Sequence, residues 1–588
     1  MKRNEIEEKY KWDLSKMYLS KDAFMKDFQD VKNEIKNIEK YKEKFLESSD
    51  IFIEFMNLLE NINRKVEKMY TYTHLAVDVE PENGDMQSLN ASILGLLEEL
   101  GNKTVFIDLE ILKKEEKARK VLEDERCKKY TNMINHVLRT KPHVLSDETE
   151  EVLSLASGVM GASYKTYSNI RAEFEPVVLD GEEHFLNEET AKEFLKNPDE
   201  SIRKQAYEKL NVEYKKMENV YASTLEGTMK KDVFYSKARN FKSPLEASTF
   251  GDEVSEDLFY KVLKAANTDY HEYYLEYLDV FKKIMGKEKL DNYDLRYPIV
   301  REPEKKYTID DAFELIFKAT ENYGAEYREI MQKARDERWI DYMPHEGKRH
   351  GAYSSGCFDS NPYILTSFIG DIESVFTLIH ELGHSAHSYF SNHNQDYVNS
   401  DYRIFVAEVA SITNENLLMN LLIENTTDIE EKKFLLFRKL DEFIGTCYRQ
   451  PFFANFENIL HEKVANNEGL SSQTITDLYE KLSEEYYGGR VNLHEYSKYT
   501  CYAVPHFYYN YYVYKYTVGM CVASVIAKRI FEGDKEQKEK YLNFLKSGSS
   551  KSPVELLKSA GVDPLDENLY KEAFENFKKD LEEFKKLN

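Results

Sequence analysis

One apolar stretch of the chain holds the residues best suited to chemistry. It reads Phe376-Thr377-Leu378-Ile379-His380-Glu381-Leu382-Gly383-His384 and contains the pattern H-E-x-x-H. On a helix, His380 and His384 stand one turn apart on the same face, so both imidazoles can bind one metal ion. Glu381 follows the first histidine and can reach a metal-bound water molecule. Neutral ligands, an open coordination position and a carboxylate base are what a zinc hydrolase needs.

Two histidines and a glutamate with this spacing can also occur by chance on a solvated helix. The neighbours argue against chance here, because Val375, Phe376, Leu378, Ile379 and Leu382 make the helix apolar. Polar groups buried in such a helix are costly unless they have partners. The stretch therefore predicts a metal site.

A catalytic zinc site needs a third protein ligand. The metzincin pattern would place a further histidine at position 390, but this residue is Phe390, so that class is excluded. A second apolar segment, 405–415, predicts a returning helix and contains Glu408, which the pattern predicts to be buried. We predict that His380, His384 and Glu408 bind a single Zn²⁺ ion per chain.

Two further polar residues share the predicted helix face of Glu408. Ser411 and Glu415 follow it at helical spacing and are candidates to orient a metal ligand. For Glu415, a solvated surface charge is an equally good interpretation.

Together these motifs resemble the M3 family of zinc oligopeptidases, and most closely its bacterial oligoendopeptidase F branch. H-E-L-G-H-S-x-H begins at His380, and F-V-x-E-V-A-S begins at Phe405. Weaker matches are W-D-L at Trp12, K-R-H-G-A-Y at Lys348 and P-H-F-Y-Y at Pro505, so the resemblance spans nearly the whole chain. It implies a zinc metalloendopeptidase that cleaves short unstructured oligopeptides, with Glu381 activating a zinc-bound water.

The late stretch 499–516 is rich in tyrosine and reads as an aromatic helix. Most of its tyrosines are interpreted as core residues, although a buried tyrosine hydroxyl usually has a partner. In the M3 family, tyrosines and a histidine of this helix face the zinc. The resemblance therefore implies His506 and Tyr509 as catalytic residues that donate to the oxyanion, followed by Tyr512 and Tyr508 as substrate-binding residues.

The segment 342–368 breaks the helical pattern and predicts a pair of strands before the H-E-x-x-H helix. In this layout an edge strand binds the backbone of a peptide by adding it to the sheet. Gly351, Ala352 and Tyr353 are the predicted edge and substrate-binding residues. A sheet that only packs against the helix is the alternative.

The composition limits the partners and the compartment. With 81 basic and 106 acidic residues, the chain has a net charge of −25, which argues against nucleic acid. It has neither a secretory segment at its start nor an apolar run that could span a membrane. The five cysteines lack metal-site spacing and read as reduced thiols, so we expect a cytoplasmic protein whose partners are short peptides. The sequence does not predict the oligomeric state.

Few glycines and prolines interrupt long helical patterns, so we expect a mostly α, multi-lobed zincin-type fold with a small β-sheet beside the H-E-x-x-H helix. At 588 residues the chain is too long for one core. We predict an N-terminal helical lobe over residues 1–190, ending in a hairpin that turns at Asp180-Gly181, and a catalytic domain over residues 191–588.

Two rival functions remain open from the sequence. A related zinc carboxypeptidase needs a basic residue for the C-terminal carboxylate of its substrate, and Lys498, Lys515 and Arg403 are candidates. A non-catalytic peptide-binding protein with a structural zinc is disfavoured because the site contains its own base, Glu381.

Overall fold

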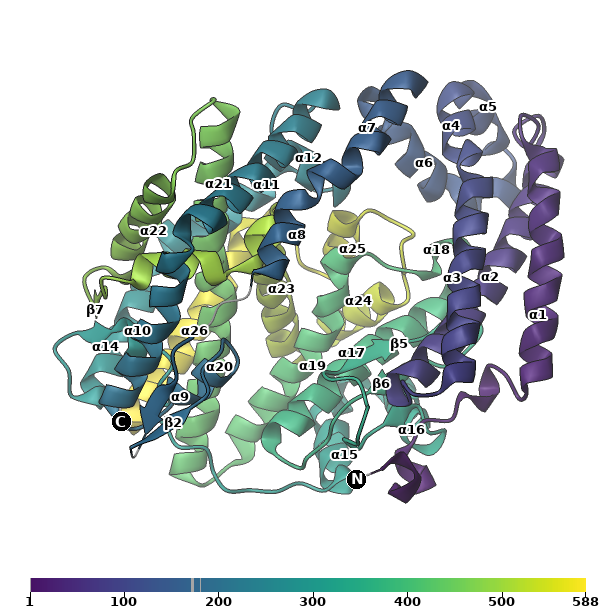
Figure 1. Cartoon of the computed structure of the whole chain (residues 1–588). Helices are drawn as coiled ribbons and strands as arrows, with labels where there is room; N and C mark the ends of the chain where they lie inside the picture. Colours follow the sequence, from purple (N-terminus) through teal and green to yellow (C-terminus); the bar gives the residue numbers. More distant parts are fainter. Residues whose placement is uncertain (1, 171–173, 180) are drawn as a thin grey trace. The chain divides into compact units, whose positions relative to one another are not determined.

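The computed structural model describes residues 2–170, 174–179 and 181–588 (Figure 1). Helices dominate it and the strands are short, so the predicted fold class is confirmed. Contacts divide the chain into two discontinuous compact units. Unit 1 comprises Met1–Pro142, Glu304–Leu422 and Ala523–Asp563; unit 2 comprises His143–Pro303, Ile423–Val522 and Pro564–Asn588. The proposed division at residue 190 stays a prediction.

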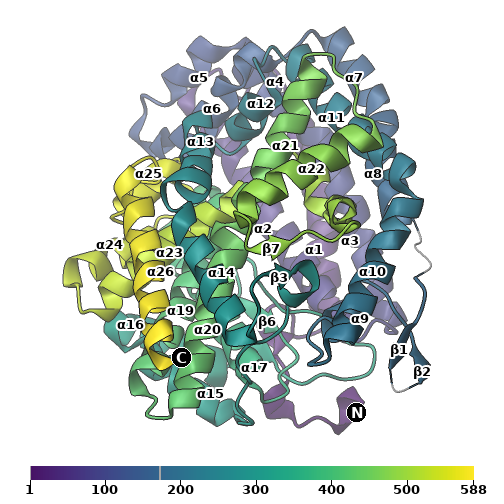
Figure 2. The same cartoon turned by 90° about the vertical axis from the view of Figure 1, so that its left-hand side faces the viewer.

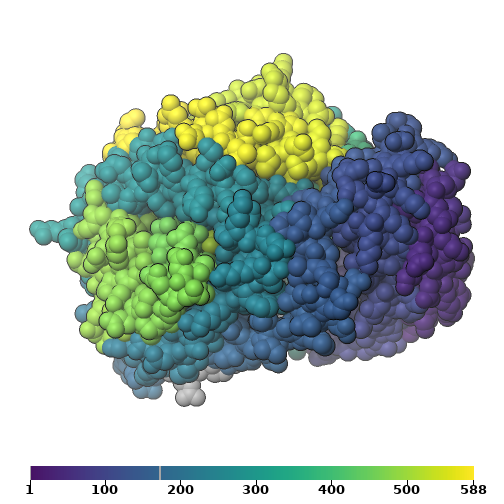
Figure 3. All heavy atoms as spheres, turned by 90° about the horizontal axis from the view of Figure 1, so that it is seen from above, coloured from purple at the N-terminus to yellow at the C-terminus, as the bar shows by residue number. Residues whose placement is uncertain are grey.

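The first part of unit 1 is a group of packed helices. They are α1 (Lys21–Glu34), α2 (Ser49–Val79), α3 (Gly84–Thr104), α4 (Phe106–Lys113), α5 (Glu115–Val121) and α6 (Thr131–Arg139). The long helix α2 packs against α1 and α3, and the purple surface in Figure 3 belongs to the N-terminal part of this group. Helix α2 buries Phe52, Phe55, Leu59, Ile62 and Val66, which recur at helical spacing and form one apolar face.

The rest of unit 1 surrounds the H-E-x-x-H helix. Its helices are α15 (Ile309–Ala319), α16 (Ala325–Asp336), α17 (Ile372–Asn394), α18 (Tyr397–Ser400), α19 (Ile404–Asn425), α24 (Lys535–Leu545) and α25 (Pro553–Ser559). A three-stranded sheet has the order β4 (Ile340–Asp341), β6 (Tyr363–Leu365) and β5 (Tyr353–Ser355). Strand β6 pairs parallel with β4 and antiparallel with β5, and α17 packs against β5 and β6. The predicted strand pair beside this helix is therefore confirmed.

Unit 2 is also helical. Its helices are α7 (Asp147–Met160), α8 (Ala162–Asn169), α9 (Thr190–Phe194), α10 (Glu200–Lys216), α11 (Glu218–Ala238), α12 (Pro244–Gly251), α13 (Glu256–Lys264), α14 (His271–Met285), α20 (Ile429–Cys447), α21 (Arg449–Ala465), α22 (Ser472–Tyr487) and α26 (Glu567–Leu587). Helix α23 (Tyr514–Phe531) begins in unit 2 and ends in the segment of unit 1 that starts at Ala523. Figure 2 shows α26 running beside α14 and α20.

Two small strand pairs belong to unit 2. Strands β1 (Val177–Leu179) and β2 (Glu182–His184) form the predicted antiparallel hairpin, although Asp180 of its turn lies outside the described residues. Strands β3 (Leu290–Asp291) and β7 (Val491–Asn492) pair in parallel. Of the described helices, none is both long enough and apolar enough to cross a membrane.

The expected helix over 499–516 is wrong. This stretch contains the 3-10 helices η10 (Ser497–Ala503) and η11 (Pro505–Tyr508), and α23 begins only at Tyr514. Pro505 interrupts the helical pattern because it lacks a backbone donor. Asn510 and Tyr511 then adopt the left-handed backbone conformation, with φ of 48° and 56°. A left-handed pair of residues cannot continue a right-handed helix.

Candidate metal centre

Helix α17 positions both predicted histidine ligands. The Asp371 side chain caps its first turn and accepts a hydrogen bond from the Ser374 backbone N–H at 2.8 Å. His380 and His384 follow one turn apart, and their ring centroids lie 4.9 Å from each other. The buried side of the helix, which includes Leu378, Ile379 and Leu382, fixes the direction in which the imidazoles point.

Helix α19 provides the third predicted ligand. Oε2 of Glu408 lies 3.5 Å from Nε2 of His380 and 3.6 Å from Nε2 of His384. The three ligand atoms all lie within 4.8 Å of one another, close enough to share one ion. The prediction that Glu408 is buried is wrong, since its side chain is 43% exposed. This exposure leaves one side of the cluster open, as a catalytic metal site requires.

A glycine allows the two ligand helices to approach. A Cβ atom at Gly383 would lie 2.7 Å from the Cα of Ser411 and 2.9 Å from the Ala410 carbonyl oxygen. Both contacts are with backbone, which cannot rotate away. Position 383 must therefore be a glycine for α17 and α19 to cross this closely and for Glu408 to lie beside the two histidines.

The side chains predicted to orient the ligands contact them. The Ser411 hydroxyl donates to Oε2 of Glu408 at 3.0 Å. Oε1 of Glu415 lies 3.3 Å from Nδ1 of His380 and thus orients the ring whose Nε2 faces the cluster. Burial alone would lower the pKa of His380, but the hydrogen bond with Glu415 and the charges of nearby carboxylates raise it to about 9. Glu415 is therefore a partner of His380 and not a solvated charge.

The predicted base lies at the same place. Glu381 is only 6% exposed, and its Oε2 has no hydrogen-bond partner among the described residues. Burial raises the pKa of Glu381 to about 7, and the charge of His380 opposes this shift. A carboxyl group with a pKa near neutrality can both accept and return a proton.

The residues present fit a zinc ion. Two imidazoles and one carboxylate are the donor set of many catalytic zinc sites. The partnerless oxygen of Glu381 adds a buried acceptor for a water molecule beside these ligands. Burial, and next the positive charge of His380, lower the pKa of His384.

The predicted substrate edge lies beside α17. Strand β5 is an edge of its sheet, since it pairs with β6 alone among the described strands. The hydroxyls of Ser354 and Ser385 lie 2.8 Å apart and tie this strand to α17. Gly351 and Ala352 precede the strand, which begins at Tyr353, whose hydroxyl donates to Asp78 at 2.8 Å.

The late-segment residues belong to unit 2, so their role toward the metal site stays a prediction. Tyr509 is 43% exposed, and its hydroxyl lies 3.1 Å from that of Tyr164 on α8. The rings of His506 and Tyr512 stack with centroids 6.2 Å apart, and burial lowers the pKa of His506. Tyr508 differs from the other three because it is buried.

The hydroxyl of Tyr508 lies 2.8 Å from that of Thr224, and its ring stacks on Tyr167 at 4.1 Å. This is the core arrangement that the sequence offered as the alternative for these tyrosines.

Helix α17 carries a further histidine, His387, the last residue of the motif H-E-L-G-H-S-x-H, for which the sequence predicted no role. His387 is 1% exposed and stacks on Tyr402 with ring centroids 3.7 Å apart. The hydroxyls of Tyr402 and Ser388 lie 2.8 Å apart and share a hydrogen bond. Burial lowers the pKa of His387 to about 3, so the ring is neutral and packs as a core residue. The helical spacing from His384 could have predicted that His387 lies near the same face of α17.

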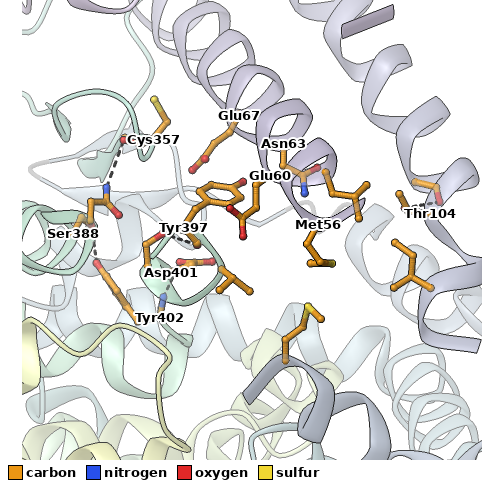
Figure 4. A pocket seen from close by; sticks show the side chains of 18 of the residues that line it. Met56, Glu60, Asn63, Glu67, Thr104, Cys357, Ser388, Tyr397, Asp401 and Tyr402 are labelled. Atoms are coloured by element: carbon orange, nitrogen blue, oxygen red, sulfur yellow. Dashed lines mark hydrogen bonds between the residues drawn. The ribbon is translucent and has the colours of Figure 1, made fainter. Parts of the chain in front are cut away.

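Tyr402 and Ser388 also line a hollow of about 720 Å³ in unit 1 (Figure 4). Glu60, Glu67 and Asp401 face it, and no described lining residue is basic. Burial raises the pKa of Glu67 to about 7. The hollow is therefore acidic, and it is distinct from the metal cluster.

Two histidines and a glutamate on crossing helices, beside a buried glutamate and a sheet edge, are the arrangement expected of a metallopeptidase site. Residues 193–576 match the profile of Peptidase family M3, and residues 111–172 match that of Oligopeptidase F. The chain belongs to peptidase family M3 and is a metalloendopeptidase.

Individual relatives support this over the full length. Oligopeptidase PepF of Bacillus subtilis is 34% identical over 100% of this chain and 88% of its own length. Group B oligopeptidase PepB of Streptococcus agalactiae is 33% identical over 100% of this chain and 98% of its own. The crystal structure of oligoendopeptidase-F from Enterococcus faecium aligns with a TM-score of 0.73 and 29% identity, covering 96% of this chain and 98% of that one.

Proposed function

We propose that the chain is a zinc-dependent endopeptidase of short unstructured oligopeptides, with one zinc ion held by His380, His384 and Glu408. The observation that carries this proposal is the ligand cluster itself, whose donor atoms lie within 4.8 Å of one another beside the buried Glu381. When bound, zinc supplies Lewis-acid chemistry that acidifies water and polarises a peptide carbonyl.

The base of the reaction is Glu381. Its Oε2 accepts a proton from the attacking water and later delivers it to the nitrogen of the leaving amine. The raised pKa of this carboxyl, about 7, supports both transfers near neutral pH. Ser411 and Glu415 orient Glu408 and His380 through the contacts of 3.0 Å and 3.3 Å.

Other residues bind the substrate and its developing charge. His506 and Tyr509 donate to the oxyanion of the tetrahedral intermediate, a role that the exposed ring of Tyr509 supports. Gly351, Ala352 and Tyr353 bind the peptide backbone along the edge of the sheet. Tyr512 contacts the substrate through its ring, whereas the buried Tyr508 is engaged with Thr224 and Tyr167 and is not proposed to bind substrate.

The substrate class is short peptides. The relatives are named oligopeptidases and oligoendopeptidases, which supports this class. The resemblance to the M3 family implies peptides of roughly 5–20 residues as the size range, and an extended chain of such a length spans about 3.3 Å per residue. We propose a cytoplasmic location, which the five cysteines support because none of them forms a disulfide.

A peptide ladder tests this function. The protein is stripped of metal, reloaded with zinc and incubated with peptides of increasing length and with one protein in native and denatured form. We expect mass spectrometry to show internal cleavage of the short peptides by the zinc-loaded protein alone, and Glu381→Gln serves as the inactive control. Full activity of a verified metal-free sample contradicts the mechanism, and efficient digestion of long unfolded chains contradicts the size limit.

A further inference from the structure

The basic residues first considered for a substrate carboxylate already have partners. Lys498 lies 3.4 Å from Glu480 and 3.6 Å from Asp477, and Lys515 lies 2.6 Å from Asp252. Because both lysines already form ion pairs within the protein, neither is a good candidate to bind a substrate carboxylate.

A different pair of basic residues lines a cavity in unit 2. This cavity of about 440 Å³ has Arg296 and Arg449 in its wall, together with Asp441 and several tyrosines. Arg449 is the first residue of α21, while Arg296 follows the short helix η8 (Asn292–Asp294). Neither guanidinium makes an ion pair or a hydrogen bond with any described residue, so both keep their donors available for a ligand.

The charges of this cavity do not balance. Asp441 is the one carboxylate among its described lining residues, so one positive charge remains in excess. Desolvation by the surrounding protein, and next the like charge of Arg449, lower the pKa of Arg296. Desolvation also raises the pKa of Asp441 in spite of both arginines. The positive end of the α21 dipole adds to the excess. In a chain of net charge −25, this is a local positive site.

Two more features of the wall suit an anion. Tyr277 is 4% exposed, and its hydroxyl, a hydrogen-bond donor, has no partner among the described residues. Arg296 and Asp441 are accessible to solvent, so a ligand can enter. The same cavity is lined by Pro505 and His506, which connects it with the segment proposed to act in catalysis.

We propose that this cavity binds the C-terminal carboxylate of the peptide substrate, with Arg296 and Arg449 as the charged donors and Tyr277 as a neutral one. The inference rests on the proposed function, because a carboxylate anchor would determine which peptides the proposed peptidase site accepts. The planar fork of arginine matches the two oxygens of a carboxylate.

Binding of matched peptides tests the anchor separately from catalysis. Zinc-loaded Glu381→Gln protein is titrated by calorimetry with one peptide sequence in two forms, the free C-terminal acid and the C-terminal amide. We expect the acid to bind at least about tenfold more tightly, since hydrogen bonds to charged groups are among the stronger ones. Arg296→Gln and Arg449→Gln, each added to this protein, should bring the ratio close to one. Lys498→Gln, which removes a charge already paired, should leave it unchanged.

Each outcome has one meaning. Equal binding of acid and amide overturns the proposal without any arginine variant, so misfolding of a variant cannot hide the answer. Competition by acetate against the acid but not against the amide supports a carboxylate site. If acetate binds to the cavity while the peptides show no preference, the cavity takes only free anions and the proposal is wrong. A wild-type protein that prefers the acid but cleaves neither peptide refutes the proposed function and leaves the anchor standing.

Discussion

The Glu457 carboxylate accepts a hydrogen bond from the backbone N–H of Tyr511, with 2.6 Å between Oε1 and the nitrogen. Glu457 is fully buried, and its other oxygen has no partner among the described residues. The Tyr511 hydroxyl donates to Asn458 at 3.0 Å, and its ring stacks on His461 at 4.6 Å. These contacts hold Tyr511 left-handed, a conformation that costs about 1–2 kcal/mol. Tyr509 and Tyr512 flank this turn, so Glu457 is a positioning residue for them.

Replacing Glu457 tests this positioning. Glu457→Leu removes the acceptor, and we expect kcat to fall by up to roughly 100-fold with KM little changed, because a shift of about 1 Å near the chemistry can have this effect. Glu457→Gln keeps an acceptor for Tyr511 and should stay within a few-fold of wild type. Steady-state kinetics on one peptide measure both. Equal activity of the leucine variant and wild type contradicts the role.

The same carboxyl predicts a pH dependence of stability. Burial raises the pKa of Glu457 to about 8, from a value of 4.5 expected for an unfolded chain. The folded chain therefore binds the proton more tightly, and this contribution to stability is complete below the unfolded pKa and is lost as the pH rises toward 8.

Glu457→Gln cannot ionise, so wild type should lose stability relative to it between roughly pH 5 and pH 9. The difference should reach a few kcal/mol, since one pKa unit corresponds to about 1.4 kcal/mol. Denaturant unfolding at several pH values measures it, and parallel curves for the two proteins contradict the assignment.

Metal binding and proton transfer should separate by mutation. Glu381→Gln keeps the ligand set but cannot accept a proton, so we expect full zinc content and a loss of at least about 100-fold in kcat. His384→Ala should lose both zinc and activity. Metal analysis beside kinetics distinguishes the two, and a glutamine variant within tenfold of wild type shows that the base lies elsewhere.

The hydroxyls of Tyr509 and Tyr164 lie in contact, but we expect them to contribute unequally to kcat. Tyr509→Phe removes the proposed oxyanion donor and should lower kcat on the order of 10²–10³, with little change in KM. Tyr164→Phe keeps that donor and should cost less than about tenfold. His506→Ala should resemble Tyr509→Phe. If all three variants match wild type, this segment is structural.

Gly383→Ala should strain the crossing of α17 and α19. The added Cβ would lie 2.7 Å from the Cα of Ser411, so α19 must move and carry Glu408 with it. We expect a stability loss of about 1–3 kcal/mol and weaker zinc binding. Gly445→Ala in α20 is the matched control, because a Cβ there meets nothing within 4 Å. Thermal melting and a zinc competition assay follow both variants, and equal behaviour excludes a steric role for Gly383.

Local patterns in the sequence predicted the parts of the fold whose causes are local. Helix α17 and its histidines follow from apolar spacing and a short motif, and α19 follows from a second apolar run. The late segment was misread because its conformation depends on Glu457, which lies on another helix. The same holds for Arg296 and Arg449, since nothing near either residue signals that folding places both in one cavity.

The five buried cysteines can serve as native probes of local unfolding. None of the five forms a disulfide, and Cys127 and Cys357 lie in unit 1, while Cys447, Cys501 and Cys521 lie in unit 2. A thiol reagent can modify each sulfur only while its surroundings are transiently unfolded. Labelling followed by peptide mapping would therefore report how often each half of the chain opens, with no introduced probe.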